Sequence, residues 1–405
     1  MKPWLSIVGI GEDGLDGLTP RARQALDAAK LVVGGRRHLD LAKVSHERAL
    51  VWPQPLEAAF PAILALRGTE VCVLASGDPL HYGVGTTVLR AFARDEMRFL
   101  PGLSSFSLAA ASLGWSLQDC TCLSLHGRAL ERLIPALQPG ARILALSWDE
   151  TTPRRVVELL VERGFGDADI TVCESMNGSR HSIRSALARD FQLTNVDPLN
   201  MIALEIPAHS TGRALPLSAG LGDAWFEHDG QMTRSDMRAI TLAALRPHPG
   251  QLLWDIGAGS GSIGIEWMLR GPSLRTIAIE PRPDRAARIK RNAMALGVPQ
   301  LDIVEASAPQ GLETLADPDA IFIGGGAILA GMIETAWARL KPRGRLVINA
   351  VTIETQSLLA THHRTKGGEL VQINLAHAEP LGRFQGWRAA MPLVQWRITK
   401  SGAGP

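Results

Sequence analysis

Alternating glycines follow a short apolar run at residues 252–261, which read Leu-Leu-Trp-Asp-Ile-Gly-Ala-Gly-Ser-Gly. Glycine tolerates a positive φ and lets a ligand approach the backbone closely, because it has no Cβ. A helix that begins directly after such a turn directs its free N–H groups toward the ligand. A second apolar run, residues 276–279, ends at Glu280, whose carboxylate can accept hydrogen bonds from both hydroxyls of a ribose. These residues predict a site for a nucleotide-type cofactor.

Two cofactors compete for this site. Residues 259–264 read Gly-Ser-Gly-Ser-Ile-Gly and match the dinucleotide fingerprint G-x-G-x-x-G, which on its own is weak evidence for NAD. Asp255 argues against NAD, because a carboxylate at the end of the strand would face the pyrophosphate of a dinucleotide. The same carboxylate suits a cationic ligand such as the amino group of S-adenosylmethionine. We therefore expect S-adenosylmethionine, with NAD as the alternative.

Residues 252–261 and Glu280 resemble motifs I and II of the class I methyltransferases, which bind S-adenosylmethionine. Residues 229–238, 320–326 and 347–355 are similar to the decarboxylating methyltransferase subunits of cobalamin biosynthesis. Relatives often have an acidic residue at the position of Ser307, whose hydroxyl can still accept a hydrogen bond from the adenine amino group. Residue types and resemblance together give these expected cofactor contacts in the second half: Thr233, Asp255, Gly257, Ala258, Gly259, Ser260, Gly261, Glu280, Ser307 and Ala308.

Three loops of the first half, residues 8–11, 76–83 and 101–105, resemble the tetrapyrrole methylase family over most of residues 1–206. Members of that family have two α/β lobes and bind S-adenosylmethionine in the cleft between them. The usual Gly-Pro-Gly of the first loop is replaced here by Gly-Glu-Asp-Gly at residues 11–14. The resemblance implies cofactor contacts at Gly9, Gly11, Gly77, Asp78, Ser104 and Ser105. Taken alone, Asp78 is as well explained as a helix cap, and His81 and Tyr82 either contact substrate or simply pack.

The full chain resembles the fused decarboxylating methyltransferases of cobalamin biosynthesis. That resemblance implies S-adenosylmethionine-dependent methylation of a precorrin, a tetrapyrrole, at C5 by the first half and at C15 by the second. The C12 acetate would leave as carbon dioxide in the second half. Methyl transfer from a sulfonium needs no nucleophilic side chain, only alignment and a dry site, and the sequence shows no Ser-His-Asp or Cys-His arrangement.

Polar residues that follow the later strands are the candidates for the catalytic lining. We assign catalytic roles to Asn349 and Thr352, beside the glycines at 324–326, although each could equally be a turn residue at a strand end. The substrate carries many carboxylates, so arginines should surround both clefts, and Arg234 and Arg238 are candidates.

These residues need α/β domains to position them. The tetrapyrrole methylase-like domain is expected over 1–206, with lobes 1–115 and 120–206. A Gly-, Pro- and Ser-rich linker is expected over 207–222 and the Rossmann-like class I methyltransferase domain over 223–400. In the last domain, strands are expected at 251–256, 275–280, 301–305, 320–323, 344–349 and 391–398. The intervening helices are expected at 235–245, 262–270, 283–296, 327–340 and 354–362. This order predicts a doubly wound sheet with an antiparallel edge, an amphipathic helix after the glycines and a solvated basic face around Arg282–Arg291.

Composition limits the classes of partner and the cellular location that we expect for this protein. The chain has 405 residues, 46% hydrophobic and 20% charged, with a net charge of +2, which argues against nucleic-acid or membrane-surface partners. No signal peptide or membrane span is recognisable, so a cytoplasmic protein is expected. The four cysteines are expected to be reduced, and Cys120 with Cys122 lacks the partners of a zinc site, so no metal is expected. Both related families self-associate, which makes a homo-oligomer the expectation; a non-enzymatic tetrapyrrole carrier is the other alternative.

Overall fold

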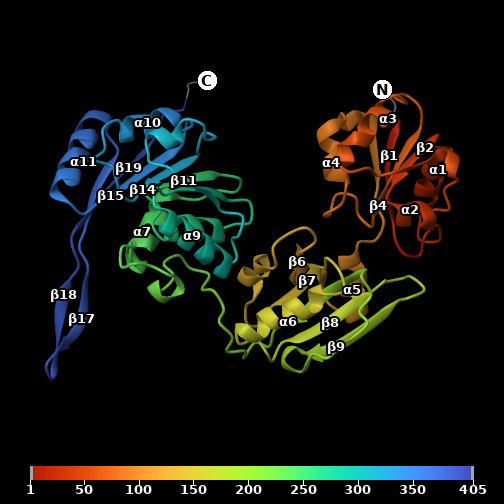
Figure 1. Ribbon diagram of the computed structural model, residues 1–405, viewed down its shortest axis with the longest axis horizontal. Helices are drawn as coiled ribbons and strands as arrows, with labels where there is room; N and C mark the ends of the chain where they lie inside the picture. Colours follow the sequence, from red (N-terminus) through yellow and green to blue (C-terminus); the bar gives the residue numbers. More distant parts are fainter. Residues whose placement is uncertain (1–2, 403–405) are drawn as a thin grey trace. The chain divides into compact units, whose positions relative to one another are not determined.

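The computed structural model describes residues 3–402, and their contacts divide into two compact units. The first unit holds the chain up to Leu130 together with Ala136–Ala214; the second holds Glu131–Pro135 and the chain from Leu215 onward (Figure 1). The main division therefore falls inside the segment 207–222, and residues 206–222 form neither helix nor strand. Within residues 3–402, no helix has the length and apolar character needed to cross a membrane.

A parallel five-stranded sheet in the order β3-β2-β4-β1-β5 begins the first unit. Its strands are β1 (Leu5–Ile10), β2 (Leu31–Gly34), β3 (Ala49–Val51), β4 (Val71–Ser76) and β5 (Met97–Leu100), and its helices are α1 (Pro20–Ala28), α2 (Arg36–Leu41), α3 (Phe60–Leu64) and α4 (Gly85–Ala91). All six residues of β1 are buried, as expected for a central parallel strand covered on both faces. Helix α1 begins where Thr19 accepts a hydrogen bond from the backbone N of Ala22 and Pro20 takes the first helical position.

A mixed five-stranded sheet in the order β6-β7-β10-β8-β9 completes this unit. It consists of β6 (Cys120–Ser124), β7 (Arg142–Leu146), β8 (Asp169–Glu174), β9 (Ser182–Leu187) and β10 (Asn200–Glu205), with helices α5 (Ser105–Leu113) and α6 (Thr152–Glu162). Phe106 and Ala109 of α5 belong to the same buried cluster as Leu144 and Met201 of this sheet. The chain therefore leaves the first sheet before α5, earlier than the split at 115–120 that the sequence suggests.

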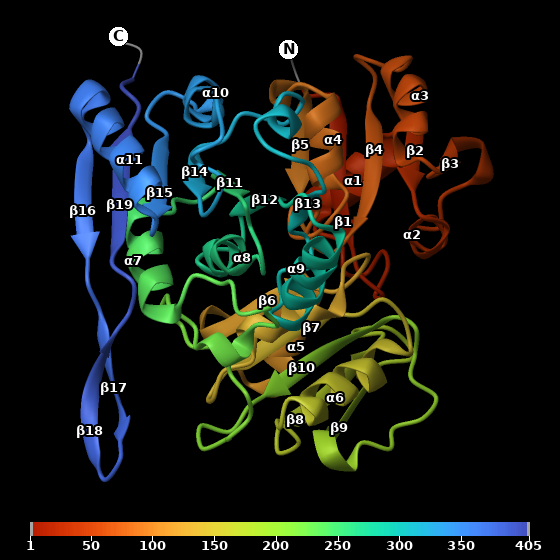
Figure 2. The ribbon, with the colours of Figure 1, turned by 60° about the vertical axis from the view of Figure 1, so that its left-hand side comes forward.

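A seven-stranded sheet in the order β13-β12-β11-β14-β15-β19-β16 forms the centre of the second unit (Figure 2). Its strands are β11 (Leu252–Ile256), β12 (Arg275–Ile279), β13 (Asp302–Val304), β14 (Ala320–Ile323), β15 (Arg345–Ala350), β16 (Glu369–Ile373) and β19 (Leu393–Thr399). The helices are α7 (Ser235–Leu245), α8 (Ser262–Leu269), α9 (Pro283–Ala295), α10 (Met332–Arg339) and α11 (Ile353–Lys366). The first five strands are parallel, and β19 runs antiparallel to both β15 and β16. The predicted doubly wound sheet with antiparallel closure is confirmed.

Helix α8 corrects one sequence-based expectation. Residues 262–268 are all buried, so the helix is covered on every side instead of being amphipathic. Its polar residue Glu266 has no solvent exposure. The glycine loop is therefore followed directly by a helix that is packed on all sides.

A hairpin that the sequence analysis did not foresee extends from the sheet. Strands β17 (Ala376–Leu381) and β18 (Phe384–Ala389) pair only with each other and project from the second unit in both views (Figures 1 and 2).

Helix α10 begins five residues later than predicted, because Gly326 and Gly331 adopt positive φ values of 76° and 75° before it.

Candidate active site

The strand order places the candidate site in the second unit. From β11 the chain proceeds outward through β12 to β13, and then returns to place β14 on the other side of β11. Ligands bind where the order of an open α/β sheet reverses, at the carboxyl ends of the strands. At this point the glycines after β11 and those at 324–326 after β14 line a cavity of about 1200 Å³.

The glycine loop is shaped by three positive φ values. Gly257, Gly259 and Gly261 have φ of 70°, 61° and 76°, a region that residues with a Cβ rarely adopt. A Cβ added at Gly257 would lie 3.2 Å from the backbone N of Gly325, and one added at Gly261 would lie 2.8 Å from Ile289 Cγ2. The glycines are therefore required both by the turn itself and by close approach of neighbouring segments.

Asp255 lies at the floor of the cavity. Its side chain is buried, and Oδ2 accepts a hydrogen bond from the backbone N of Gly264 at 2.9 Å. Burial, with the nearby charge of Glu280 adding to it, raises the pKa of Asp255 to about 7. A cationic group in the cavity would favour the ionised form of this carboxylate, whereas a pyrophosphate would not.

Glu280 and Ser260 supply further polar atoms. The Glu280 carboxylate accepts hydrogen bonds from the backbone N of Gly259 at 2.9 Å and of Arg282 at 3.2 Å, which fix its orientation. Each carboxylate oxygen can accept more than one hydrogen bond, so a ribose can still be bound there. The hydroxyl of Ser260 is buried and has no hydrogen-bond partner among the described residues. A buried polar atom without a partner beside a glycine-lined hollow fits a polar cofactor such as S-adenosylmethionine.

The opposite wall contains the loop that precedes α7 and the loop that follows β13. Gly230–Thr233 and Ala306–Ala308 line the cavity, so the structure brings Thr233, Ser307 and Ala308 to the same hollow as Asp255 and Glu280. All ten cofactor candidates predicted in this half lie at this edge of the sheet. Those that line the cavity are Thr233, Asp255, Gly257, Ala258, Gly259, Ser260, Glu280, Ser307 and Ala308. Gly261 is not part of the cavity lining and caps the N-terminus of α8.

Arg238 does not surround a substrate cleft, contrary to the expectation. It is fully buried, and its Nε donates to Glu266 of α8 at 2.8 Å, while its other nitrogens bind Asp223 and the carbonyl oxygens of Leu221 and Thr233. Arg234 is different, because it lines the cavity, pairs with Asp223 at 3.0 Å and keeps 62% of its side chain exposed.

The two catalytic candidates differ in placement. Asn349 lines the cavity; its amide donates to the Thr241 hydroxyl and accepts from Gln395 Nε2, both at 3.0 Å. Thr352 lies outside the cavity lining and caps α11, where its hydroxyl accepts a hydrogen bond from the backbone N of Thr355. The geometry thus gives Thr352 the strand-end role that was the alternative for both residues.

The base of the hairpin forms a part of the cavity that sequence reasoning missed. His377, Glu379 and Arg388 line it, and because His377 is the register partner of Arg388, these side chains share one face of the hairpin. The available signal in the sequence was Gly382-Arg383 between two short runs, the first of which, Ala-His-Ala-Glu-Pro at 376–380, alternates apolar and polar residues.

In the first unit, the three predicted loops meet at the carboxyl ends of β4, β1 and β5. A Cβ on Gly9 would lie 1.7 Å from the carbonyl oxygen of Gly77 and 2.4 Å from the backbone N of Gly102, so only glycine fits. The backbone N of Gly102 also donates to Gly77 O at 3.0 Å. The structure thus brings Gly9, Gly77 and Gly102, which lie far apart in the sequence, to one edge of the sheet.

Polar candidates in these loops have local structural partners. Asp78 accepts from the backbone N of Leu80 at 2.8 Å, and Ser104 caps α5 by accepting from Ser107 N. Ser105 is the first residue of α5, and Gly11 lies over the Asp13 carboxylate. None of these contacts excludes a cofactor, because carboxylate and hydroxyl oxygens have spare acceptor capacity.

His81 and Tyr82 pack with an aromatic neighbour. The His81 ring centroid lies 5.1 Å from that of Tyr82 and 4.6 Å from that of Phe106, and the Tyr82 hydroxyl donates to the carbonyl of Cys122. The alternative of ordinary packing therefore accounts for both residues.

A charged cavity near the first loop was also missed. It measures about 660 Å³, and Arg36, Arg37 and Lys43 line it together with acidic residues of the loop. Arg37 forms an ion pair with Glu12, and burial together with the Arg37 charge lowers the pKa of His38 to about 4. The consecutive arginines after two glycines, at 34–37, were the available sequence signal.

Comparison with known proteins assigns both halves. A family described as tetrapyrrole (corrin/porphyrin) methylases matches residues 5–180, and one described as a precorrin methyltransferase domain matches residues 224–400. A Sinorhizobium protein named precorrin-6Y C(5,15)-methyltransferase (decarboxylating) is 51% identical over 401 residues, covering 99% of this chain and 97% of its own length. The chain belongs to this family.

Two shorter relatives from Salmonella typhimurium carry single activities in their names. A cobalt-precorrin-7 C(5)-methyltransferase is 30% identical and covers 47% of this chain and 96% of its own length. A cobalt-precorrin-6B C(15)-methyltransferase (decarboxylating) is 35% identical and covers 37% of this chain and 80% of its own length. The predicted fold class, family and decarboxylating precorrin methyltransferase activity in cobalamin biosynthesis are confirmed.

Proposed function

We propose that the second unit binds S-adenosylmethionine in the 1200 Å³ cavity and carries out methylation at C15 with loss of the C12 acetate. The first unit then performs methylation at C5. Support for this division comes from the two Salmonella typhimurium relatives, each of which covers less than half of this chain and is named for one of the two reactions. The fused chain would thus combine two separate methylation sites.

The observation that carries the cofactor assignment is the buried carboxylate of Asp255 beside the glycine loop. S-adenosylmethionine would supply an activated methyl group, and the chain would supply its binding and alignment. Asp255 and Glu280 would hold the amino and ribose groups, while Thr233 and Ser307 would contact it from the opposite wall. Asp255 also opposes the NAD alternative, because it would lie against a pyrophosphate.

Substrate recognition is proposed at the mouth of the same cavity. Arg234, Arg282 and Arg388 line it, and guanidinium groups bind carboxylates by paired hydrogen bonds. The acidic partners of Arg282 and Arg388 are about half exposed, so substrate carboxylates can compete with them; Arg388, for example, pairs with Glu379 at 3.1 Å with side-chain exposures of 76% and 50%. The hairpin base would therefore contact the edge of the macrocycle.

Asn349 is proposed as a polar contact for the substrate. Both sides of its amide are held by Thr241 and Gln395, which orients the remaining N–H, and it lines the cavity. When the acetate carboxylate leaves as carbon dioxide, its electron pair passes into the conjugated ring system of the macrocycle. Unchanged methylation and carbon dioxide release in Asn349→Ala would remove this role.

Equilibrium dialysis of the full chain with labelled S-adenosylmethionine and labelled NAD tests the cofactor assignment. Binding of S-adenosylmethionine that is weakened in Asp255→Asn supports the proposal, whereas binding of NAD alone contradicts it. Saturable tetrapyrrole binding without either cofactor would instead support the carrier alternative.

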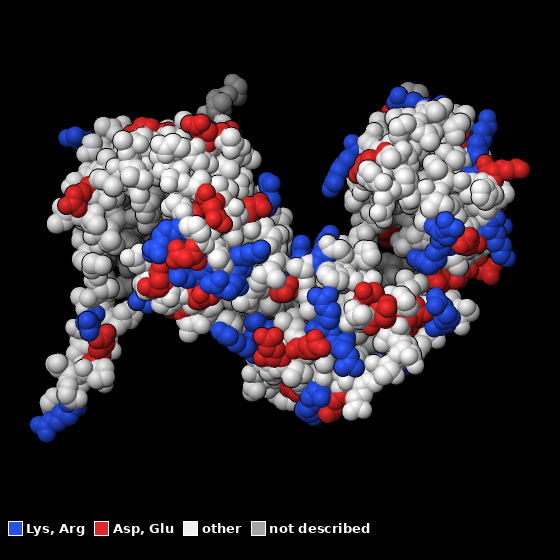
Figure 3. All heavy atoms as spheres, viewed as in Figure 1, with Lys and Arg blue, Asp and Glu red and all other residues white. Residues whose placement is uncertain are grey.

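A homo-oligomer in the cytoplasm is proposed as the assembly. The hairpin exposes Leu381, Phe384 and Trp387 by 68%, 65% and 79%, and Figure 3 shows few charged side chains along it. Large exposed apolar side chains on strands that lack outer partners favour association with a second copy of the chain. All four cysteines are free, as a reducing compartment requires.

A further inference from the structure

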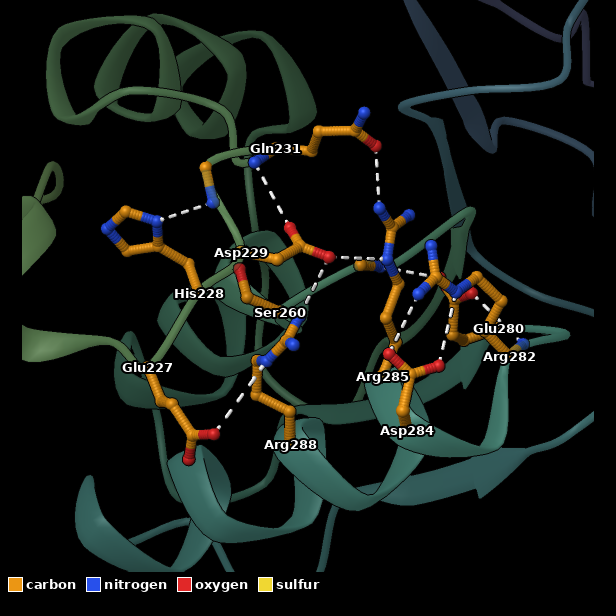
Figure 4. Close-up of polar contacts among 12 residues, drawn as sticks. Glu227, His228, Asp229, Gln231, Ser260, Glu280, Arg282, Asp284, Arg285 and Arg288 are labelled. Atoms are coloured by element: carbon orange, nitrogen blue, oxygen red, sulfur yellow. Dashed lines mark hydrogen bonds and ion pairs between the residues drawn. The ribbon is translucent and has the colours of Figure 1, made fainter.

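The loop at 227–231, whose last two residues line the proposed cofactor cavity, is held by side chains of helix α9. Asp229 lies at the centre of these contacts (Figure 4). One oxygen of its carboxylate accepts from the backbone N of Gln231 at 3.1 Å, and the other binds Arg285 Nε at 2.9 Å and Arg288 Nη1 at 3.1 Å. The second nitrogen of the Arg285 fork donates to Gln231 Oε1 at 2.6 Å.

The spacing of the α9 residues explains how one helix makes these contacts. Arg285, Arg288 and Asn292 follow one another at intervals of three and four residues, so they share one face of the helix. Asn292 is buried, and its amide donates to the carbonyl oxygens of Glu227 and Ser260 while accepting from the backbone N of Glu227. Asn292 therefore ties the loop directly to the glycine turn.

Burial shows that these are not solvated surface charges. The side chains of Arg285 and Arg288 are only 15% and 13% exposed, whereas Arg282 at the start of the same helix is 56% exposed. The expected solvated basic face around Arg282–Arg291 therefore holds for the exposed Arg282, Lys290 and Arg291, but not for Arg285 and Arg288. Partly buried ion pairs with several hydrogen bonds fix a geometry more firmly than exposed pairs do.

The held loop lies directly against the proposed cofactor site. Gly230, Gln231, Met232 and Thr233 line the cavity, and the carbonyl oxygen of Gln231 would lie 3.6 Å from a Cβ on Gly259. The loop and the glycine turn thus form two facing walls. Hydrogen bonding from Gln231, with the charges of Arg288 and Arg285, keeps the pKa of Asp229 well below its usual range, so the carboxylate is ionised at neutral pH.

We propose that Asp229, Arg285 and Arg288 are positioning residues that hold residues 229–233 closed against the glycine turn and so set the affinity for the cofactor. They do not touch the reacting atoms. The inference rests on the proposed function of the second unit, because it names that cavity as the S-adenosylmethionine site. Its consequence is that weakening these contacts should affect cofactor binding much more than the chemical step.

Hydrogen exchange in the full chain without cofactor tests the structural part. Asp229→Asn should raise amide exchange in residues 226–234, because the asparagine cannot form an ion pair with both arginines. Asp284→Asn is the matched control, since Asp284, in the first turn of the same helix, pairs at 2.9 Å with the exposed Arg282 that precedes it. Exchange in 226–234 that is equal in Asp229→Asn and the wild type overturns the proposal without reference to any cofactor.

Carbon dioxide release measured against S-adenosylmethionine concentration tests the functional part. Asp229→Asn should raise the KM for S-adenosylmethionine about tenfold, consistent with the loss of one charged hydrogen-bond set, and change kcat by less than about twofold. Methylation at C5, measured from the mass of the product in the same reaction, should show an unchanged KM for S-adenosylmethionine. Arg285→Lys, which retains charge but loses the fork, should show a smaller rise.

The outcomes separate the two proposals. A wild-type chain that binds no S-adenosylmethionine contradicts the proposed function. A wild-type chain that binds it, with an unchanged KM in both Asp229→Asn and Arg285→Lys or a fall in kcat alone, contradicts only the positioning role. Thermal unfolding of each variant identifies misfolding, and Arg285→Lys then provides the decisive comparison.

Discussion

Arg238 of α7 and Glu266 of α8 form an ion pair of 2.8 Å in which neither side chain has any solvent exposure. The Glu266 carboxylate also accepts from the backbone N of Gly220 at 2.7 Å and of Leu221 at 3.0 Å. Arg238 in turn binds the carbonyl oxygen of Thr233. The pair therefore joins the end of the 207–222 segment, the loop before α7 and helix α8 behind the glycine turn.

Removal of one partner of this pair should destabilise the second unit. Glu266→Gln removes the fully buried partner of Arg238 and leaves only the partly exposed Asp223 to balance the buried charge; breaking a buried ion pair typically costs about 3–5 kcal/mol, and the remaining Asp223 contact places the expected loss at the lower end. Urea unfolding followed by hydrogen exchange in residues 215–402 measures the loss. Arg234→Gln is the control, because that arginine is 62% exposed and should contribute less than about 1 kcal/mol. Equal effects of the two variants would contradict the burial argument.

Cofactor binding should depend on pH through Asp255. Its pKa is raised from 3.8 to about 7, so between these pH values the carboxyl group is protonated in the folded, cofactor-free protein but ionised in the unfolded chain. Stability of the cofactor-free chain should therefore fall as the pH rises from about 4 to 7 and level off above that. A cationic ligand favours the ionised form, so S-adenosylmethionine should bind more tightly at pH 8 than at pH 6, with release of a proton.

Calorimetry in buffers of different ionisation enthalpy measures that proton release at the second-unit site. Asp255→Asn should abolish the pH dependence of both stability and binding that this group contributes. A dependence that persists unchanged in the variant would show that another group titrates.

Glycine substitutions should separate the two methylations. Gly9→Ala places a Cβ 1.7 Å from Gly77 O, so the three-loop edge of the first unit cannot form. We expect C5 methylation to fall below about one hundredth of its wild-type rate while carbon dioxide release continues. Gly257→Ala, at φ 70°, should instead strongly reduce carbon dioxide release while C5 methylation continues. Product mass distinguishes them, and loss of both activities in each single variant would contradict the division of labour.

Gly68→Ala is the matched control for these variants. Gly68 also has a positive φ, 86°, but an added Cβ would meet no atom within 4 Å. It should therefore cost only about 1 kcal/mol of backbone strain and leave both product masses unchanged.

The hairpin should determine the assembly state. Replacing Phe384 and Trp387 by serine removes two large exposed apolar side chains without disturbing any buried contact of the sheet. Light scattering after gel filtration should show a smaller particle than the wild type. Arg383→Ser, in the turn of the same hairpin, should leave the mass unchanged. An unaltered particle in the double variant would show that association, if present, uses another surface.

Local patterns in the sequence determined much of the second unit. Apolar runs that end at Asp255 and before Glu280 predicted β11 and β12, and the glycines between them predicted the turn, because a short apolar run and a cluster of glycines are local sequence features. The same reasoning missed β16 and the hairpin. Strand β16 pairs with β19, which follows only after the hairpin in the sequence. Strands β17 and β18 pair with each other and are almost entirely exposed, so no buried apolar face marks them in the sequence.

Tertiary structure alone decided the roles of the charged residues. In the sequence, Arg234 and Arg238 look alike, yet packing of α7 on α8 buries Arg238 against Glu266 and leaves Arg234 at the cavity mouth. Likewise, the basic stretch of α9 became the support of the 227–231 loop because the fold brings Asp229 to that face of the helix. The positions and spacing of charged residues can be read from the sequence, but long-range packing determines which charged side chains are buried.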